Sequence, residues 1–206
     1  LVFSVLGSII GGVAAPTEAA AMGAIGAILV TIGARRFSMK ALLETVESTA
    51  KITATMMFIL VCAQIFALAF RGLNGEDLIH DLFKLVPGGV NSDILFLMAL
   101  IFVLGFFLEW IEISFIAVPL FLPVFIAQDV NLVWLTMLIC LNLQSSFLTP
   151  PFGWALFFLK GVAPPEVKTI HIYKGVVPFI AMQFVAIAIV FVVPDIALWL
   201  PKYIGW

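Results

Sequence analysis

The sequence has few charged residues and few tyrosines for its length. Charged residues make up 11% of the 206 positions and hydrophobic residues 64%, against roughly 25% and 45–50% in a soluble domain. A chain with so little polar surface cannot cover itself in water, so the lipid bilayer must be the solvent for most of it. The 20 Phe and 2 Tyr indicate aromatic side chains that face lipid or pack inside the protein.

Other absences exclude further classes of protein. The net charge of −2 provides no basic face for nucleic acid. Cys62 and Cys140 lie inside apolar runs, which indicates small buried residues rather than a disulfide or a metal site. His80 and His171 have no partner at metal-ligand spacing, and catalytic motifs such as a nucleophile elbow or a phosphate-binding loop are missing. No Lys or Arg lies inside a span, which disfavours a voltage sensor.

Long apolar segments predict an all-α, polytopic integral membrane protein. The expected elements are a segment at 1–32 interrupted by Val13 to Glu18, an amphipathic stretch with Ser38 as its N-cap, a span at 52–70, a hydrophilic loop at 71–93 and a last span at about 175–200. Pro16 marks either a second broken helix or a kink whose small neighbours allow close packing, and we favour the kink. The chain begins without Met or a signal peptide, so we expect position 1 to lie within a longer protein.

Residues 94–127 predict a helical hairpin. Two apolar arms of about 15 residues, or roughly 22 Å of helix each, surround the polar tip Glu109-Trp110-Ile111-Glu112. Such arms are short for a full span and suggest a re-entrant element.

The distribution of charge supports this hairpin. The basic loop at 33–51 belongs in the cytoplasm, and the acidic loop at 71–93 then lies outside. The basic loop at 160–174 returns to the cytoplasm only if 94–127 enters and leaves on one side, as a re-entrant hairpin or as two complete spans.

Residues 131–160 predict a long helix that is broken at Thr149-Pro150-Pro151 and Gly153. Consecutive prolines remove two backbone donors and bar the α conformation before them. The opened helix frees carbonyl groups that suit Na⁺ together with side-chain oxygens, and the half-helix beginning near Phe152 offers its positive end to an anion. The alternative is a simple proline kink.

Polar residues of the hairpin tip and the broken helix are the predicted site. A carboxylate inside an apolar segment costs about 2.5–3.5 kcal/mol and usually marks a functional cavity, although a wet hairpin tip would merely solvate it. The predicted substrate- or ion-binding residues are Glu109, Glu112, Ser114, Asn142, Gln144, Ser145, Thr149, Pro150, Pro151 and Gly153, with Asn142 and Thr149 as candidate Na⁺ ligands. No catalytic residue is predicted.

Three runs of sequence resemble motifs of one family. GGVAAPTEAAAMGAIGAIL and NLQSSFLTPPFGWALFFLKGVAP resemble elements of the large membrane subunit (DctM-type permease) of tripartite ATP-independent periplasmic (TRAP) transporters. LGFFLEWIEISFIAVPLFLPV resembles the family's second hairpin, including Pro119 and Pro123. The motifs stand in the family's order across almost the whole chain, which corresponds to roughly the C-terminal half of such a subunit.

The resemblance implies a permease of the bacterial inner membrane rather than an enzyme. It implies import of an anionic organic solute, such as a carboxylate, driven by Na⁺ as the coupling ion and with no other cofactor. A periplasmic binding protein would deliver the solute, and a small four-helix membrane subunit would brace the permease. The large subunit would contain two inverted repeats and work by an elevator-like motion, with Thr149, Pro150, Pro151 and Gly153 near sodium and Gly105 to Glu112 at the hairpin tip.

The sequence departs from the family pattern at three places. Glu109-Trp110 replaces a common Asp-Pro, Ala15 stands where Thr is frequent, and Ser145-Ser146 replaces Ile-Gly or Met-Gly. The changed tip brings bulk and charge near the site, and it is similar to the branch associated with mannitol or chloroaromatic compounds.

We therefore predict three functional regions. Residues 1–93 would form scaffold-like spans with a cytoplasmic basic loop and a periplasmic acidic loop, 94–160 the transport-site element, and 161–206 a cytoplasmic loop with the final span. Two other functions stay open. A membrane-embedded enzyme would use Glu109 and Glu112 as general acid and base, but it lacks a clear nucleophile or metal site. A structural subunit would tolerate Gln at both positions.

Overall fold

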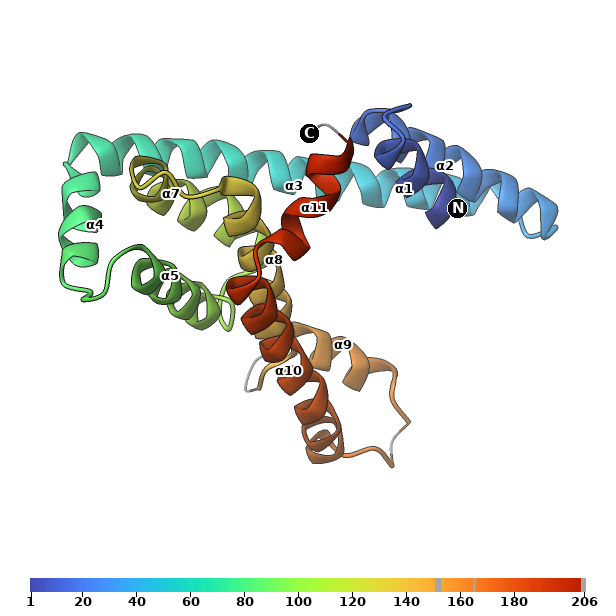
Figure 1. The fold of residues 1–206 in the computed structure, drawn as a ribbon. Coiled ribbons are helices and arrows are strands. Elements are labelled where there is room, and N and C mark those ends of the chain that lie inside the picture. Colours follow the sequence, from blue (N-terminus) through green and yellow to red (C-terminus); the bar gives the residue numbers. More distant parts are fainter. Residues whose placement is uncertain (151–152, 165, 205–206) are drawn as a thin grey trace. The chain divides into compact units, whose positions relative to one another are not determined.

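The computed structural model describes residues 1–150, 153–164 and 166–204, and their regular structure is entirely helical (Figure 1). Four helical stretches within these residues are long and apolar enough to cross a membrane: α2 (Pro16–Gly33), α3 (Met39–Gly72), Trp110–Ala127 and α10 (Thr169–Val192). The predicted all-α, polytopic membrane fold is confirmed.

Tertiary contacts divide the chain into two compact units. The first comprises Leu1–Met57 with Leu200–Trp206, and the second comprises Phe58–Trp199. The helices α3 and α11 (Asp195–Ile204) each have residues in both units. The division into compact units does not show which residues function together. The predicted functional boundaries at residues 93 and 160 therefore stay a prediction.

The first unit begins with two antiparallel helices, α1 (Val2–Ile10) and α2, rather than one interrupted segment. Gly23 lies against Val5 and Gly26 against Leu1, where added β-carbons would approach those side chains to 3.2 and 2.6 Å. The predicted close packing of small residues is therefore confirmed, whereas the single segment at 1–32 is wrong. Pro16 takes the first helical position of α2, where no backbone donor is needed.

The helix α3 is continuous from Met39 to Gly72, so the amphipathic stretch and the span at 52–70 form one element. Pairs of opposite charge four residues apart, Lys40 with Glu44 at 3.9 Å and Lys51 with Glu47 at 2.7 Å, lie along its polar first half. Such pairs support a helix on the side of solvent.

The predicted hydrophilic loop at 71–93 is wrong in part, because it contains the amphipathic helix α4 (Gly75–Lys84). Ile79 and Phe83, four residues apart, are buried on one face. The Phe83 ring makes edge-to-face contacts with Phe96 and Phe125 at centroid distances of 5.4 and 5.5 Å. Aromatic contacts thus hold α4 against the helices that contain Phe96 and Phe125.

Residues 90–128 form the expected hairpin. Its first arm is α5 (Val90–Leu104), and its second is α6 (Trp110–Glu112), the π-helix η1 (Ile113–Ala117) and α7 (Val118–Ala127) in succession. At the base, Gln128 Nε2 donates to Asp93 Oδ2 at 2.7 Å. The two arms therefore begin and end on the same side, as the charge distribution required, while the re-entrant depth stays a prediction. The π-helix precedes Pro119, whose ring conflicts with the carbonyl group four residues earlier and favours a wider turn.

Three further helices complete the core of the second unit. The helices α8 (Leu132–Leu148) and α10 run antiparallel, and Trp134 Nε1 near the start of α8 donates to Val190 O near the end of α10 at 2.8 Å. The short α9 (Trp154–Val162) follows α8, and Leu156 packs against Ile172 and Val176 of α10. The predicted basic loop thus shortens to 163–168, and the last span begins at Thr169 and ends at Val192.

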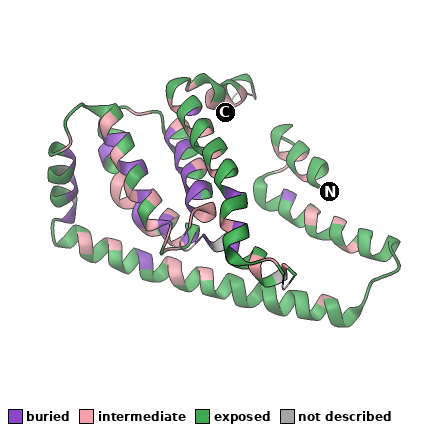
Figure 2. Cartoon of the chain, turned by 90° about the horizontal axis from the view of Figure 1, so that it is seen from below, coloured by how far each residue is buried: buried purple, intermediate pink, exposed green. Residues whose placement is uncertain are grey.

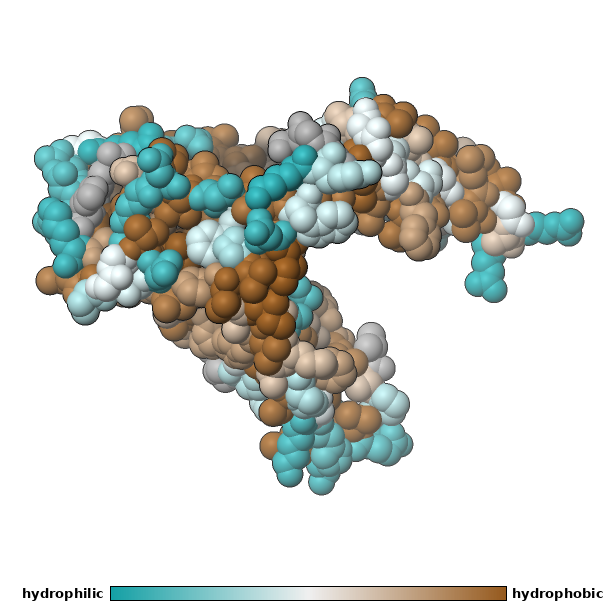
Figure 3. Space-filling view, in the orientation of Figure 1, coloured by the Kyte–Doolittle hydropathy of each residue, from teal (hydrophilic) through white to brown (hydrophobic). Residues whose placement is uncertain are grey.

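Burial differs sharply between the helices. Buried positions gather on α5, η1, α7 and α8, whereas α1, α2, α3 and most of α10 are exposed (Figure 2). Figure 3 shows hydrophobic surface along α10, with hydrophilic atoms around the loop that precedes it. Exposed apolar helices of this kind are typical of surfaces that meet lipid or further membrane helices.

Candidate transport site at the hairpin tip

The hairpin tip lies beside the end of α8. The helices α5 and α8 run in parallel, and the buried Asn142 Nδ2 donates to Met98 O at 2.7 Å. Further along, a β-carbon on Gly105 would overlap Ser146 Oγ and lie 2.7 Å from Ser146 Cβ. Only glycine permits this approach, which brings the end of the first arm to the level at which α8 stops.

The helix break is present where the sequence predicts it. Thr149 is extended, with φ −91° and ψ 126°, as expected before proline. The Gly153 N–H donates to Thr149 O at 3.1 Å, and α9 begins at the next residue. Pro150 is half-buried in the break, and Pro151 lies outside the described residues.

Three hydroxyl groups near the break donate their protons to the backbone of α8. Ser145 Oγ donates to Leu141 O at 2.9 Å and Thr149 Oγ1 to Ser145 O at 2.8 Å. Ser146 Oγ donates to Leu143 O at 2.8 Å. A hydroxyl whose proton is engaged in this way keeps its lone pairs for another partner, so these oxygens remain candidate ligands for a hard cation.

The two glutamates of the tip differ in their surroundings. Glu109 is exposed and extended, immediately before α6. Glu112 is half-buried, and its Oε2 accepts a hydrogen bond from the Glu109 N–H at 3.1 Å. Glu112 therefore caps the first turn of the second arm, a role that spacing alone had left open. Ser114 is half-buried within η1, a type of helix that is frequent at functional sites.

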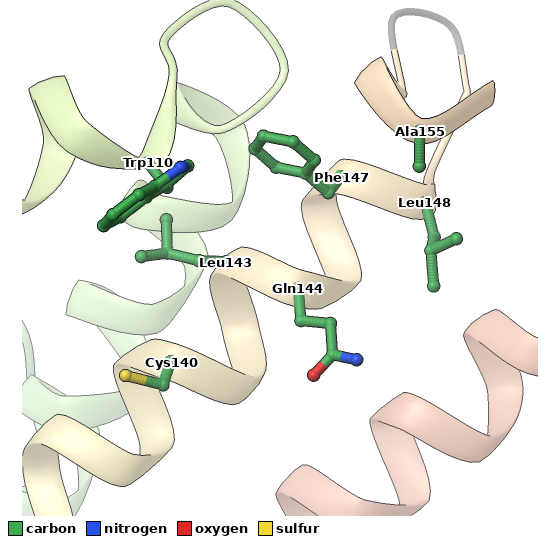
Figure 4. A pocket seen from close by; sticks show the side chains of 7 residues that line it. All are labelled: Trp110, Cys140, Leu143, Gln144, Phe147, Leu148 and Ala155. Atoms are coloured by element: carbon green, nitrogen blue, oxygen red, sulfur yellow. The ribbon is translucent and has the colours of Figure 1, made fainter. Parts of the chain in front are cut away.

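The hairpin tip and the two halves of the broken helix together line a cavity of about 450 Å³ (Figure 4). Its lining extends from Trp110, the first residue of α6, to Ala155 in the first turn of α9. The exposed Gln144 is the predicted site residue that lines it. The other lining residues are apolar or weakly polar: Cys140, Leu143, Phe147 and Leu148.

Several residues of this region were missed from the sequence. Ser146 is fully buried at the contact with Gly105 but was not predicted as a site residue. The available signal was that Ser145-Ser146 departs from the family pattern. Cys140 was expected to be buried, yet Cys140 and Cys62 are both exposed. An apolar run cannot reveal which side of a helix meets protein, because in a membrane both sides are apolar.

Comparison with known proteins identifies the family. Residues 1–196 match the family model of the tripartite ATP-independent periplasmic transporter, DctM component. The chain is 25% identical over 199 residues to the sialic acid TRAP transporter permease protein of Haemophilus influenzae, covering 96% of this chain and 32% of that protein. It is 26% identical over 222 residues to the C4-dicarboxylate TRAP transporter large permease protein of Vibrio cholerae, covering 98% and 49%.

A third relative is the isethionate TRAP transporter permease protein of Oleidesulfovibrio alaskensis, at 30% identity over 196 residues, with coverage of 93% of this chain and 30% of that protein. The chain thus spans half or less of the length of these curated relatives. The family match covers nearly all of this chain, and its apolar helices agree with the inner-membrane location of such permeases. The chain therefore belongs to the DctM component family of tripartite ATP-independent periplasmic transporters and is an integral protein of the inner membrane.

Proposed function

We propose that this chain supplies a hairpin and a broken helix to the large permease subunit of a sodium-coupled importer of organic anions. Family membership supports transport rather than catalysis. The names of the three relatives include sialic acid, C4-dicarboxylate and isethionate, all of them organic acids or their anions.

The observation that carries the proposal is a helix N-terminus that meets the hairpin tip at one cavity. The cavity is lined from Trp110, where the second arm begins, to Ala155 in the first turn of α9. The N-terminus of a helix carries partial positive charge and free N–H groups, which favour an anion. Because the Glu112 carboxylate already caps the second arm, the N-terminus of α9 would stabilise the carboxylate of a solute, while the apolar walls contact its carbon skeleton.

Sodium coupling is supported by the oxygens on the neighbouring side of the break. The hydroxyls of Ser145 and Thr149 have their protons engaged, and the amide nitrogen of Asn142 is engaged with Met98 O. The remaining lone pairs of Ser145 and Thr149, together with carbonyl groups at the break, would coordinate Na⁺, while Asn142, about 10 Å earlier along α8, would hold that helix against the hairpin. Ion binding at the break would then order the solute cavity beside it.

The proposal includes two partners. A periplasmic binding protein would deliver the solute, and a small membrane subunit would brace the permease during an elevator-like motion. Membership of a tripartite transporter family supports both. The joint designation DctMQ in the name of the isethionate relative supports the second.

The test is uptake by proteoliposomes that contain the complete transporter, with its binding protein supplied outside. We expect uptake of an organic acid to require an inward Na⁺ gradient and to stop when choline replaces Na⁺. Thr149→Ala should raise the Na⁺ concentration for half-maximal uptake roughly tenfold, as expected for loss of an interaction worth about 1.4 kcal/mol. Thr149→Ser, which keeps the hydroxyl, should restore it.

Thr136→Ala is the matched control, because Thr136 lies exposed on the same helix and should leave the Na⁺ dependence unchanged. Uptake that is indifferent to Na⁺ would contradict sodium coupling. Product formation without transport would instead favour an enzyme.

A further inference from the structure

At the base of the hairpin, far along the arms from the transport cavity, lies a buried acid–amide pair. Asp93 is only 5% exposed, and its Oδ2 accepts the hydrogen bond from Gln128 Nε2 at 2.7 Å. The other oxygen of each group, Asp93 Oδ1 and Gln128 Oε1, is buried and has no hydrogen-bond partner. A buried polar atom without a partner costs about 1–3 kcal/mol, so two side by side call for an explanation.

The surroundings of this pair are apolar. Ile94, which follows Asp93 on the first arm, and Phe125, three residues before Gln128 on the second arm, are fully buried, and Val124 is nearly so. The Phe83 ring of α4 contacts the Phe96 and Phe125 rings of the two arms. An ionised carboxylate in such a setting is expensive unless a positive charge compensates it.

No cationic side chain compensates Asp93 among the described residues. Lys84 on α4 donates to Asp81 at 2.9 Å, and this pairing raises the pKa of Lys84. The other charged or titratable groups on the adjacent elements are Asp77 on α4, Asp129 after α7, and Asp195 and Lys202 on α11, while the side chains of Glu76 and His80 on α4 lie outside the description. No described ion pair joins any of them to Asp93.

We propose that this pair binds a proton, so that Asp93 is a neutral carboxylic acid whose Oδ1–H donates to Gln128 Oε1. One proton then satisfies both unpartnered oxygens and removes the buried charge, and the two groups form a reciprocal acid–amide pair. The proton comes from solvent, with no other bond made or broken.

Two other occupants fit less well. A hard metal cation collects several oxygen ligands, whereas the described residues offer it two side-chain oxygens in an aromatic and aliphatic setting. A water molecule could donate to both oxygens but would leave a buried carboxylate whose charge is compensated only by the N-terminal end of α5, in whose first turn Asp93 lies. The proton accounts for both unpartnered oxygens and also removes the buried charge, and it makes the base of the hairpin a proton-linked clasp.

Infrared spectroscopy of the purified transporter provides the direct test. At neutral pH we expect the wild-type minus Asp93→Asn difference spectrum to contain the C=O stretch of one protonated carboxyl group. The Asn amide can donate to Gln128 Oε1 and accept from Gln128 Nε2, so this variant should fold. Asp77→Asn, on the exposed side of α4, is the control and should show no such band. A difference spectrum with carboxylate bands instead would overturn the proposal.

The pH dependence of thermal unfolding is a second test, because a purely structural role of Asp93 would not change that dependence. A folded state that binds one more proton than the unfolded chain loses stability as pH rises, by about tenfold in the folding equilibrium per pH unit. This loss begins above about pH 4, where an unfolded Asp ionises. Wild-type and His80→Gln proteins should show this decline, and Asp93→Asn should lack that component.

The same experiment distinguishes the other occupants. A wild-type midpoint that rises with NaCl but not with choline chloride, through an effect abolished by Asp93→Asn, would assign a metal cation and overturn the proton. Equal pH dependence in wild type and Asp93→Asn would also overturn it. Neither result depends on sodium-coupled uptake, so the clasp and the proposed function can fail separately.

Discussion

Two helix interruptions marked by proline, at Pro16 and at Pro150, differ in what surrounds them. Before Pro16 the chain turns between antiparallel helices, and Ala19 is the single buried residue of α2. Before Pro150 the helix α8 buries Asn142, Ser145 and Ser146, and Asn142 reaches across to the hairpin. Both breaks precede a helix N-terminus, but only the break at Pro150 follows a helix that buries several polar side chains.

The difference shows how to distinguish a structural break from a candidate site. Proline explains why a helix stops, since it lacks a donor and restricts the residue before it. It does not explain why polar side chains are buried next to the break. Burying those polar groups in apolar surroundings costs free energy, and they lie beside the hairpin tip.

The largest expected effect comes from separating the tip from α8. Gly105→Ala should destabilise the protein by about 1–3 kcal/mol through overpacking and should abolish most uptake, because a β-carbon there collides with Ser146. Thermal unfolding in detergent and proteoliposome uptake measure the two effects.

Gly175→Ala is the control, since a β-carbon at Gly175 meets no atom within 4 Å. Adding Ser146→Gly to Gly105→Ala removes both colliding atoms and should restore more stability than adding Ser146→Ala, which removes only the hydroxyl. Equal stability of Gly105→Ala and the control would disprove the close contact.

The second prediction compares the two prolines directly. Pro150→Ala should allow Thr149 to join α8, displacing its hydroxyl and lowering uptake severalfold while the protein still inserts in the membrane. Pro16→Ala should leave uptake unchanged, because a first helical position needs no backbone donor. Equal losses in uptake for both variants would remove the distinction between the breaks.

The smallest effects concern two glutamates that cap helices in the same way. Glu18 Oε2 accepts from the Ala15 N–H at 2.9 Å, as Glu112 Oε2 does from the Glu109 N–H at 3.1 Å. Replacing either by Ala should cost about 1 kcal/mol or less, and Gln should retain the cap. If Glu112→Gln keeps its stability but loses uptake, the charge of Glu112 acts on the solute or ion in addition to capping the helix.

The hairpin and the broken helix were predictable because their signals are local. Two short apolar arms around Glu109 and Glu112 indicate a turn. The consecutive prolines after Thr149 disfavour a helix more strongly than a single proline, such as Pro123 or Pro178, which lies inside a helix. The amphipathic α4 was missed because its charged residues dominate the composition of 71–93, although the spacing of Ile79 and Phe83 was the available signal. The fold of α1 against α2 was missed because a turn inside an apolar run resembles a kink.

Hydropathy and proline act on neighbouring residues, so the order of amino acids is enough to indicate the lipid environment of this protein, its helices and the positions of its breaks. Which polar groups meet depends on how the helices pack. The contact of Gly105 with Ser146 and the bond from Asn142 to Met98 join residues about 40 positions apart, and the Asp93–Gln128 pair joins residues separated by 35 positions. The helices of this chain are apolar on every side, so their sequences carry no periodic pattern from which these pairings could be predicted. Close packing and buried hydrogen bonds decide which sides of the helices face one another.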